Sequence, residues 1–229
     1  MPKNTEPGRK ILVINCGSSS LKYEVYEMPH RESLGKGLVD RIGIDGGSIS
    51  HEGENGKYEK QADIPDHKVA MSLVLDALTD EHNGIIESMD EIVGVGHRVV
   101  HGGEAYSKSV VIDEDVEAAI ENNIELAPIH NPANLTGIRE ARGVFSSQTH
   151  VAVFDTAFHQ TIPPAAYLYG LPRELYDKYR IRRYGFHGTS HRYVANQAVQ
   201  LAKRSSDNTN LITCHLGNGC SVTAIKNGR

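Results

Sequence analysis

The stretch that decides the fold is residues 11–28, ILVINCGSSSLKYEVYEM, which begins as an apolar run and continues after a turn as a second run. Gly17 and three serines make up the turn. Two strand-like runs joined by a short Gly- and Ser-rich segment predict a β-hairpin. Residues 211–229, LITCHLGNGCSVTAIKNGR, repeat this pattern with a turn rich in Gly and Asn. The sequence therefore predicts two similar hairpins, one toward each end of the chain.

The residues between the hairpins predict further strands and helices. A Gly-rich segment, residues 43–61, is typical of more antiparallel strands, and apolar runs within 91–104 and 149–155 predict buried strands. Three strands followed by alternating helices and strands predict an α/β fold with a mixed sheet. Apolar residues at helical spacing predict five helices, over residues 66–84, 113–127, 131–145, 172–179 and 189–204.

Local signals refine two of these helices. Asn131 and Pro132 are expected to begin the third helix as its cap and its first residue, because Asn caps helices and Pro suits the first position. Lys203 and Arg204 are expected in the last turn of the fifth helix.

The second hairpin has two interpretations. It can join the first sheet as an edge, or it can open a second domain built like the first, whose remainder is absent from the chain. A lone hairpin is marginal in water and exposes unpaired strand edges. The pattern alone leaves both alternatives open.

The composition excludes several classes of protein. With 229 residues, 39% apolar and 23% charged residues, the chain resembles an ordinary globular protein, and its net charge of −5 gives no reason to expect nucleic acid or an anionic membrane as a partner. The polar first residues do not resemble a signal peptide, and no apolar run is long enough for a transmembrane helix. Three cysteines without C-x-x-C spacing argue against a disulfide framework or a cysteine zinc site. We expect a cytoplasmic protein.

Both hairpin turns are candidates for binding phosphate. In NCGSSSLK the turn offers backbone N–H groups and the hydroxyls of Ser18 and Ser20, and Lys22 follows within reach. HLGNG, residues 215–219, is a second such turn, in which two glycines flank Asn218. A single turn of this kind is common and is often an ordinary hairpin turn. Two at matching places predict a pair of contacts with one polyphosphate.

Other polar residues stand where strands end or helices begin. Arg98 follows a buried strand and could hold a carboxylate or phosphate, or make a surface salt bridge. His130 precedes a helix N-terminus, where it could contact an anion or cap the helix. Asp155 ends a strand and could hold metal-bound water or cap a turn. His187 and His191 have a spacing seen in zinc sites, but Gly188 places His187 before the helix, so a donor to an anion is the better interpretation.

Several longer strings resemble one known family. INCGSSSLKYE, GHRVVHGGE, APIHNPAN, VFDTAFHQTIPPAAYLYGLP, YGFHGTSHRYV and HLGNGCS are similar in order and spacing to the motifs of the acetate kinase family, from about residue 10 to 229. Propionate kinases share nearly all of these motifs. The resemblance implies the ribonuclease H-like, actin-like ATPase fold, a duplicated βββαβαβα unit. It implies a first domain over residues 1–155, and connecting helices with the opening hairpin of a second, nucleotide-binding domain over residues 156–229.

The resemblance also implies a reaction, the reversible transfer of the ATP γ-phosphate to acetate by direct in-line displacement. Arg98 would hold the acetate carboxylate and the transferring phosphoryl group, while His187 and His130 would contact the oxygens of that group. Asn15 and Asp155 would position Mg²⁺, or Mn²⁺, and its waters.

The remaining implied roles concern binding. The first phosphate loop would use Ser18, Ser20 and Lys22. The nucleotide phosphates would be contacted by His215, Gly217, Asn218 and Gly219. The pocket for the acetate methyl group would be lined by Val100, Ile129 and Phe186, and such a pocket should make propionate a poorer substrate rather than an excluded one.

The family comparison further implies that the chain lacks a second catalytic arginine, a metal-binding glutamate, most of the adenosine pocket and most of a homodimer interface. Two hypotheses follow. The chain is part of an acetate kinase that works once its second domain is complete, or it is a carboxylate- or phosphate-binding module without turnover.

Overall fold

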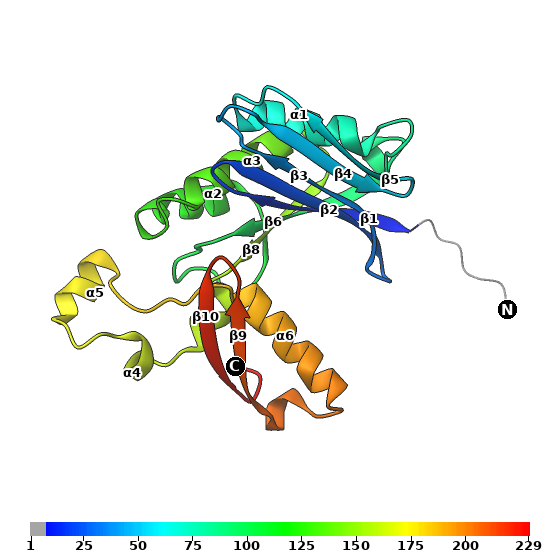
Figure 1. The fold of residues 1–229 in the computed structure, drawn as a ribbon. Coiled ribbons are helices and arrows are strands. Elements are labelled where there is room, and N and C mark those ends of the chain that lie inside the picture. Colours follow the sequence, from blue (N-terminus) through cyan, green and yellow to red (C-terminus); the bar gives the residue numbers. More distant parts are fainter. Residues whose placement is uncertain (1–7) are drawn as a thin grey trace. The chain divides into compact units, whose positions relative to one another are not determined.

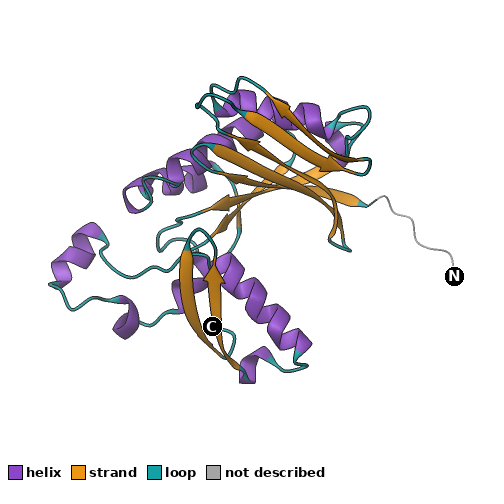
Figure 2. Ribbon diagram, in the orientation of Figure 1, coloured by secondary structure: helices purple, strands orange, loops and turns teal. Residues whose placement is uncertain are grey.

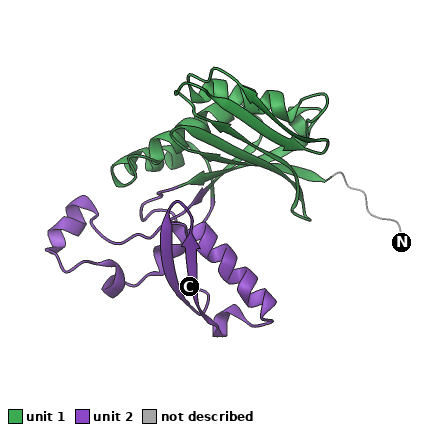
Figure 3. Ribbon diagram, viewed as in Figure 1, with its two compact units in different colours: residues 1–99, 110–152 green, residues 100–109, 153–229 purple. Residues whose placement is uncertain are grey.

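The computed structural model describes residues 8–229, which form two compact units (Figure 3). The first unit contains the chain up to residue 99 together with residues 110–152. The second unit contains residues 100–109 and 153–229. The boundary predicted after residue 155 stays a prediction, and each unit is described by itself.

A large mixed sheet forms the centre of the first unit (Figure 1). The order of its eight strands is β5-β4-β3-β2-β1-β6-β8-β7, and the last two residues of β8 belong to the second unit. The strands are β1 (Arg9–Cys16), β2 (Ser20–Met28), β3 (Glu32–Asp40), β4 (Ser48–Gly53), β5 (Gly56–Gln61), β6 (Ile92–Val99), β7 (Val110–Val111) and β8 (Thr149–Phe154).

The pairing of β1 determines where the polar strand ends lie. β1 is antiparallel to β2, with Asn15 opposite Lys22, and parallel to β6, with Ile14 beside His97. The strands from β1 to β5 form an antiparallel meander. The mixed sheet that the sequence predicts is therefore confirmed. Because β1 and β6 run in the same direction, their carboxyl ends lie at the same edge, where α/β sheets commonly bind ligands.

Three helices belong to the first unit, and α1 and α3 cover one face of its sheet (Figure 2). The helices are α1 (His67–Leu78), α2 (Glu114–Asn122) and α3 (Asn131–Val144). Burial alternates along β1 and β2, and the buried apolar residues of both strands pack against these helices. This core includes Leu12, Ile14, Leu21, Val25, Met71, Val74, Leu78, Ala141 and Phe145.

The start of α3 corrects one prediction. Asn131 is the first residue of the helix rather than its cap, Pro132 follows it, and His130 takes the cap position without a capping side-chain hydrogen bond. The Asn131 amide instead donates to the Ile120 carbonyl at 3.0 Å, which ties α3 to α2. Long-range packing therefore uses the side chain that local sequence rules assign to capping.

The second unit contains short helices, one long helix and a hairpin (Figure 1). Its elements are α4 (Pro164–Tyr167), α5 (Arg173–Tyr179), α6 (Gly188–Leu201), β9 (Asn210–Leu216) and β10 (Cys220–Lys226). Lys203 and Arg204 lie beyond α6, so placing them in its last turn was wrong. No helix among residues 8–229 is long and apolar enough to cross a lipid bilayer.

The hairpin of β9 and β10 is a two-stranded sheet of its own, separate from the eight-stranded sheet. Its two strands are antiparallel, with Cys220 opposite Leu216 across the HLGNG turn. The interpretation of this hairpin as an edge of the first sheet is therefore wrong. The alternative, in which it opens a second domain built like the first, stays a prediction.

Candidate active site

In the first unit, three predicted site residues meet on one face of the sheet. Arg98 Nη1 donates to Asn15 Oδ1 at 3.2 Å, joining the carboxyl ends of β6 and β1. Lys22 is paired with Asn15 across the β1–β2 hairpin, and residues directly opposite in a ladder share a face. Their neighbours Ile14 and Leu21 point to the other face, into the core. The structure thus gathers two cations and an amide beside the Gly–Ser turn.

Two residues that the sequence analysis missed make hydrogen bonds to backbone carbonyls at the Gly–Ser turn. His67, the first residue of α1, has Nε2 at 2.8 Å from the Gly17 carbonyl. Asn134 of α3 donates to the Cys16 carbonyl at 2.7 Å. Within the turn, the Gly17 amide donates to the Ser20 carbonyl at 2.7 Å. Both helices therefore bind carbonyl oxygens of the turn, and Ser18 is left exposed to solvent.

His130 and Ile129 lie just before α3. Both are exposed, Ile129 to 72%. His130 occupies the cap position of α3 without a side-chain capping hydrogen bond, and its contact with an anion stays a prediction. Asn134, one helical turn further on, reaches the end of β1, and Gly137 lets α3 approach closely because a Cβ there would lie 2.5 Å from Cys16 Cβ. These contacts fix the start of α3 at the same edge as the turn.

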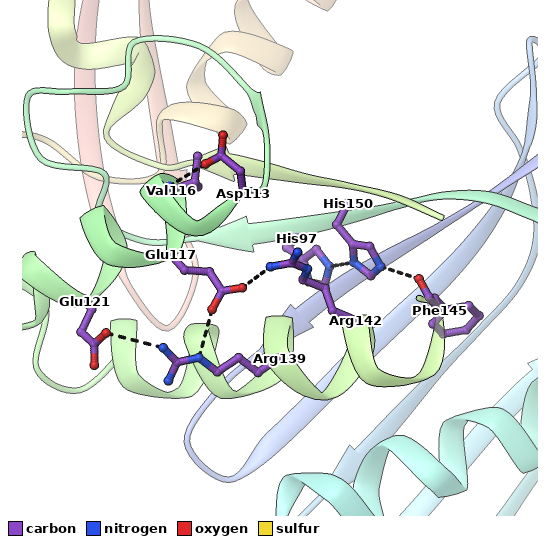
Figure 4. A network of polar contacts seen from close by, with 9 residues as sticks. All are labelled: His97, Asp113, Val116, Glu117, Glu121, Arg139, Arg142, Phe145 and His150. Carbon is purple, nitrogen blue, oxygen red and sulfur yellow. Dashed lines mark hydrogen bonds and ion pairs between the residues drawn. The ribbon is translucent and has the colours of Figure 1, made fainter. Parts of the chain in front are cut away.

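A pair of buried histidines supports the strand that carries Arg98 (Figure 4). His97 Nε2 lies 2.9 Å from His150 Nδ1, and His150 Nε2 lies 2.9 Å from the Phe145 carbonyl. Since a carbonyl only accepts, His150 Nε2 carries the proton, and His97 donates to His150 Nδ1. Burial, followed by the charges of His150 and Arg142, lowers the pKa of His97 to about 3. Burial also lowers the pKa of His150.

Helices α2 and α3 are joined by an ion-pair network beside this histidine pair (Figure 4). Glu117 of α2 accepts from Arg139 at 3.0 Å and also pairs with Arg142. Arg139 reaches Glu121 at 3.5 Å as well. These arginines are balanced by carboxylates, so this cluster is a structural contact between helices rather than a site for an anion.

In the second unit, a close backbone contact connects Asp155 with the start of α6. Asp155 is 2% exposed, and its carbonyl accepts from the Gly188 amide at 2.9 Å. A Cβ on Gly188 would lie 2.3 Å from that carbonyl oxygen, so only glycine fits here. His187, the cap of α6, has φ 57°, a left-handed conformation that is uncommon for a side chain of this size. Such conformations are often found at functional sites.

The ring of His187 lies over the β9–β10 turn. It stacks on His215, with centroids 4.1 Å apart and planes at 18°. A Cβ on Gly219 would lie 2.9 Å from His187 Cε1 and Nε2, so the turn comes within contact of the ring edge. The Gly217 amide donates to the Gly219 carbonyl at 3.0 Å and closes the turn. The structure therefore brings His187, His215 and the HLGNG turn together.

A chain of hydroxyl and imidazole groups extends inward from His187. Its Nδ1 lies 2.8 Å from Ser221 Oγ, which also lies 2.8 Å from His191 Nε2. His191 Nδ1 is 2.8 Å from Thr213 Oγ1. Burial, followed by the charges of His159, His187 and His215, lowers the pKa of His191. Both histidines considered for zinc face hydroxyl groups, and among residues 8–229 no group of three or more His, Cys, Asp or Glu could hold a metal ion.

Two of the predicted methyl-pocket residues also belong to the second unit. Val100 is buried at 4% exposure, whereas Phe186 is 40% exposed. His101, the neighbour of Val100, contacts the Phe186 ring edge-on at 5.8 Å, and His159 Nε2 lies 2.9 Å from the Phe186 carbonyl. Burial lowers the pKa of His101 to about 4, so this histidine is neutral at pH 7 and serves as packing. The third residue, Ile129, belongs to the first unit.

Comparison with known proteins now adds the family. Residues 10–229 match the model of the Acetokinase family. The chain belongs to the acetokinase family. This acetokinase chain is 56% identical over 221 residues to the acetate kinase of Desulfitobacterium hafniense. The aligned residues cover 96% of this chain and 55% of that relative. The chain thus spans about half the length of the curated relatives it matches.

Solved structures of family members have the same fold. The crystal structure of Porphyromonas gingivalis acetate kinase matches this acetokinase chain with a TM-score of 0.91 and 47% identity, over 96% of this chain and 55% of that one. A propionate kinase from Francisella tularensis matches with a TM-score of 0.89 and 42% identity, over 96% and 55%. The predicted α/β fold and the resemblance are confirmed. The roles assigned to individual residues stay predictions.

Proposed function

We propose that this acetokinase chain takes part in the reversible transfer of the γ-phosphoryl group of ATP to acetate, which gives acetyl phosphate and ADP. The observation that carries the proposal is the placement of Arg98 beside Asn15, at the carboxyl ends of two parallel strands and next to a turn rich in glycine and serine. This placement offers a guanidinium group and a phosphate-binding turn at one edge of one sheet. Both are needed to bring a carboxylate to a phosphate.

The reaction requires little covalent help from a protein. A carboxylate oxygen of acetate attacks the γ-phosphorus while the bond from that phosphorus to the bridging oxygen breaks, and ADP leaves with the electron pair. Catalysis then depends on alignment and on stabilising the charge of the phosphoryl oxygens. Arg98 suits this role because a guanidinium group can bind a carboxylate or phosphate through two N–H groups. His187 and His130 would donate hydrogen bonds to phosphoryl oxygens.

The two turns would bind the other phosphates. Backbone N–H groups and hydroxyls around Ser18 and Ser20, with Lys22, would form the first loop. The amides around Asn218 in the HLGNG turn, together with His215, would contact phosphates of the nucleotide. In both units the turns are fixed by contacts from neighbouring helices, which reduces the entropy lost when a ligand binds.

The family implies a magnesium ion, and each unit offers an oxygen ligand of the kind that this ion prefers. Mg²⁺ prefers oxygen ligands and usually keeps several waters, bound through one or two carboxylates and the substrate phosphates. Asn15 offers an amide oxygen and Asp155 a carboxylate. Either oxygen would suit the ion or one of its waters, and the bound ion would neutralise charge on the phosphates. Localisation in the cytoplasm and assembly as a homodimer are also proposals, which rest on the family resemblance.

Propionate is the second candidate substrate, because a propionate kinase is among the similar solved structures. An extra methylene in an apolar pocket changes selectivity by about 10–200-fold. The test, in an enzyme whose second domain is complete, is formation of the acyl phosphate from MgATP and either acid, trapped with hydroxylamine. We expect acetyl hydroxamate, with a kcat/KM for acetate above that for propionate. A preference for propionate would support the second candidate, and no hydroxamate from either acid would contradict the proposal.

A further inference from the structure

Four side chains, Thr213, His191, Ser221 and His187, form a hydrogen-bonded series. Counting the protons that each can donate leads to a new role for its two hydroxyl groups. Three contacts of 2.8 Å join the four side chains. Each hydroxyl has one proton to donate, and a neutral imidazole ring has one N–H and one acceptor nitrogen. With both rings neutral, three arrangements satisfy all three contacts. In two of them every member donates in the same direction along the series, and in the third Ser221 accepts from both rings while its own proton points away from them.

In the outward arrangement the protons point toward His187. The Thr213 hydroxyl donates to His191 Nδ1, His191 Nε2–H donates to Ser221, and the Ser221 hydroxyl donates to His187 Nδ1. His187 then carries its proton on Nε2. In the inward arrangement all three bonds are reversed, and His187 Nε2 becomes a lone pair.

Burial argues against the inward arrangement, and the third leaves the Ser221 hydroxyl proton without an acceptor, since within residues 8–229 the structure gives this hydroxyl only the two histidines as partners. Thr213 is 6% exposed and His191 is 1% exposed. Inward bonds would leave the Thr213 hydroxyl proton without an acceptor, since within residues 8–229 the structure gives this hydroxyl His191 as its one hydrogen-bond partner. A buried donor without a partner costs about 1–3 kcal/mol. Outward bonds leave only a hydroxyl lone pair unused, and the lowered pKa of His191 keeps that ring neutral, as the chain requires.

We propose that Thr213 and Ser221 are positioning residues that keep His187 in its Nε2–H form, so that this nitrogen always presents a hydrogen-bond donor. The Nε2 edge is the one next to the β9–β10 turn, where a Cβ on Gly219 would lie 2.9 Å away. Protonating Nδ1 as well would remove the acceptor of the Ser221 hydroxyl and leave its proton without a partner in the series. In this form His187 is an uncharged donor, suited to an anionic oxygen. That this oxygen belongs to a phosphoryl group rests on the proposed function.

The test is two-bond ¹H–¹⁵N NMR of the chain labelled with ¹⁵N-histidine at neutral pH, without ligand. We expect His187 and His191 both protonated at Nε2, each with Nδ1 shifted as a hydrogen-bond acceptor. His159 supplies an internal reference, because its Nε2 faces a carbonyl at 2.9 Å and must carry the proton. Either His187 or His191 protonated at Nδ1 would overturn the proposal.

Paired variants test the direction in which the hydrogen bonds of this series are donated. Ser221→Ala should move His187 Nδ1 to the position of a nitrogen without a hydrogen bond, whereas Ser221→Thr, which keeps the hydroxyl, should not. Thr213→Val should do the same to His191 Nδ1, and Thr213→Ser should not. An unchanged His187 Nδ1 in Ser221→Ala, with the His159 signal at its wild-type position, would also overturn the proposal.

Adding inorganic phosphate separates this inference from the proposed function. A shift of His187 Nε2 would support both. If the protonation of the ring nitrogens is as expected but His187 Nε2 does not respond to phosphate, the positioning role is retained. That result would count against the proposed contact with a phosphoryl oxygen.

Discussion

Acid should destabilise the first unit through its buried histidine pair. His150 Nδ1 already accepts a proton from His97, so protonating it would place two N–H groups against each other. Protonating His97 would place a charge in the core, where its side chain is 2% exposed. The fold therefore favours the neutral pair, and the pKa of His97 falls from 6.5 in a free side chain to about 3.

The size of the effect follows from this shift. A histidine whose pKa is lowered by folding contributes its full stability above the unfolded value of 6.5, and this contribution is lost as the pH falls toward 3. Between pH 7 and pH 5 the unfolded chain takes up most of a proton that the folded chain refuses. The free energy of unfolding should then drop by about 2 kcal/mol from His97 alone.

The assay is urea unfolding followed by circular dichroism at pH 7 and pH 5, with hydrogen exchange in a peptide from β6 to assign the transition to the first unit. His97→Gln keeps a side-chain donor but cannot titrate, so it should lose about 2 kcal/mol less than wild type over this range. His82→Gln, at an exposed position, should behave as wild type. An equal loss in wild type and His97→Gln would refute the reasoning.

Two further predictions concern packing and thiols. Gly137→Ala should lower the free energy of unfolding by about 1–3 kcal/mol, because its Cβ would lie 2.5 Å from Cys16, whereas Gly143→Ala in the same helix meets nothing within 4 Å and should be neutral or stabilising; similar urea midpoints for both variants would contradict this. Cys214 and Cys220 are exposed and should react quickly with a thiol reagent at pH 8, whereas burial raises the pKa of Cys16 to about 12, so this thiol should react only after unfolding. Three fast thiols in the folded chain would disprove this.

Sequence patterns predicted the elements well because their signals are local. The apolar runs of β1 and β2, the helical spacing in α1 and the Asn-Pro start of α3 are signals between neighbouring residues, and the structure confirms each of these elements. Arg98 and Asn15 were predicted separately, and only the parallel pairing of β6 with β1 brings them to 3.2 Å. Parallel pairing between residues 83 positions apart leaves no local signal.

The supporting residues could not be predicted for the same reason. His67 and Asn134 bind carbonyls of the Gly–Ser turn from two helices. Ser221, a residue of β10, contacts both His187 and His191. Each acts through a tertiary contact. Asn131 shows the opposite case, in which a good local capping signal yields to a hydrogen bond with another helix.

The measurement that tests the central claim most directly is ATP formation from acetyl phosphate and MgADP. The chain, within an enzyme whose second domain is complete, would be purified from a host without an acetate kinase of its own, as wild type, Arg98→Ala and Arg139→Ala. Arg139 is a matched control, because it is an arginine of the same unit that pairs with Glu117 and Glu121 outside the candidate site. We predict ATP formation by wild type and Arg139→Ala, and a rate lower by about 10²–10³-fold in Arg98→Ala. Equal rates in wild type and Arg98→Ala, or none in any folded sample, would contradict the account.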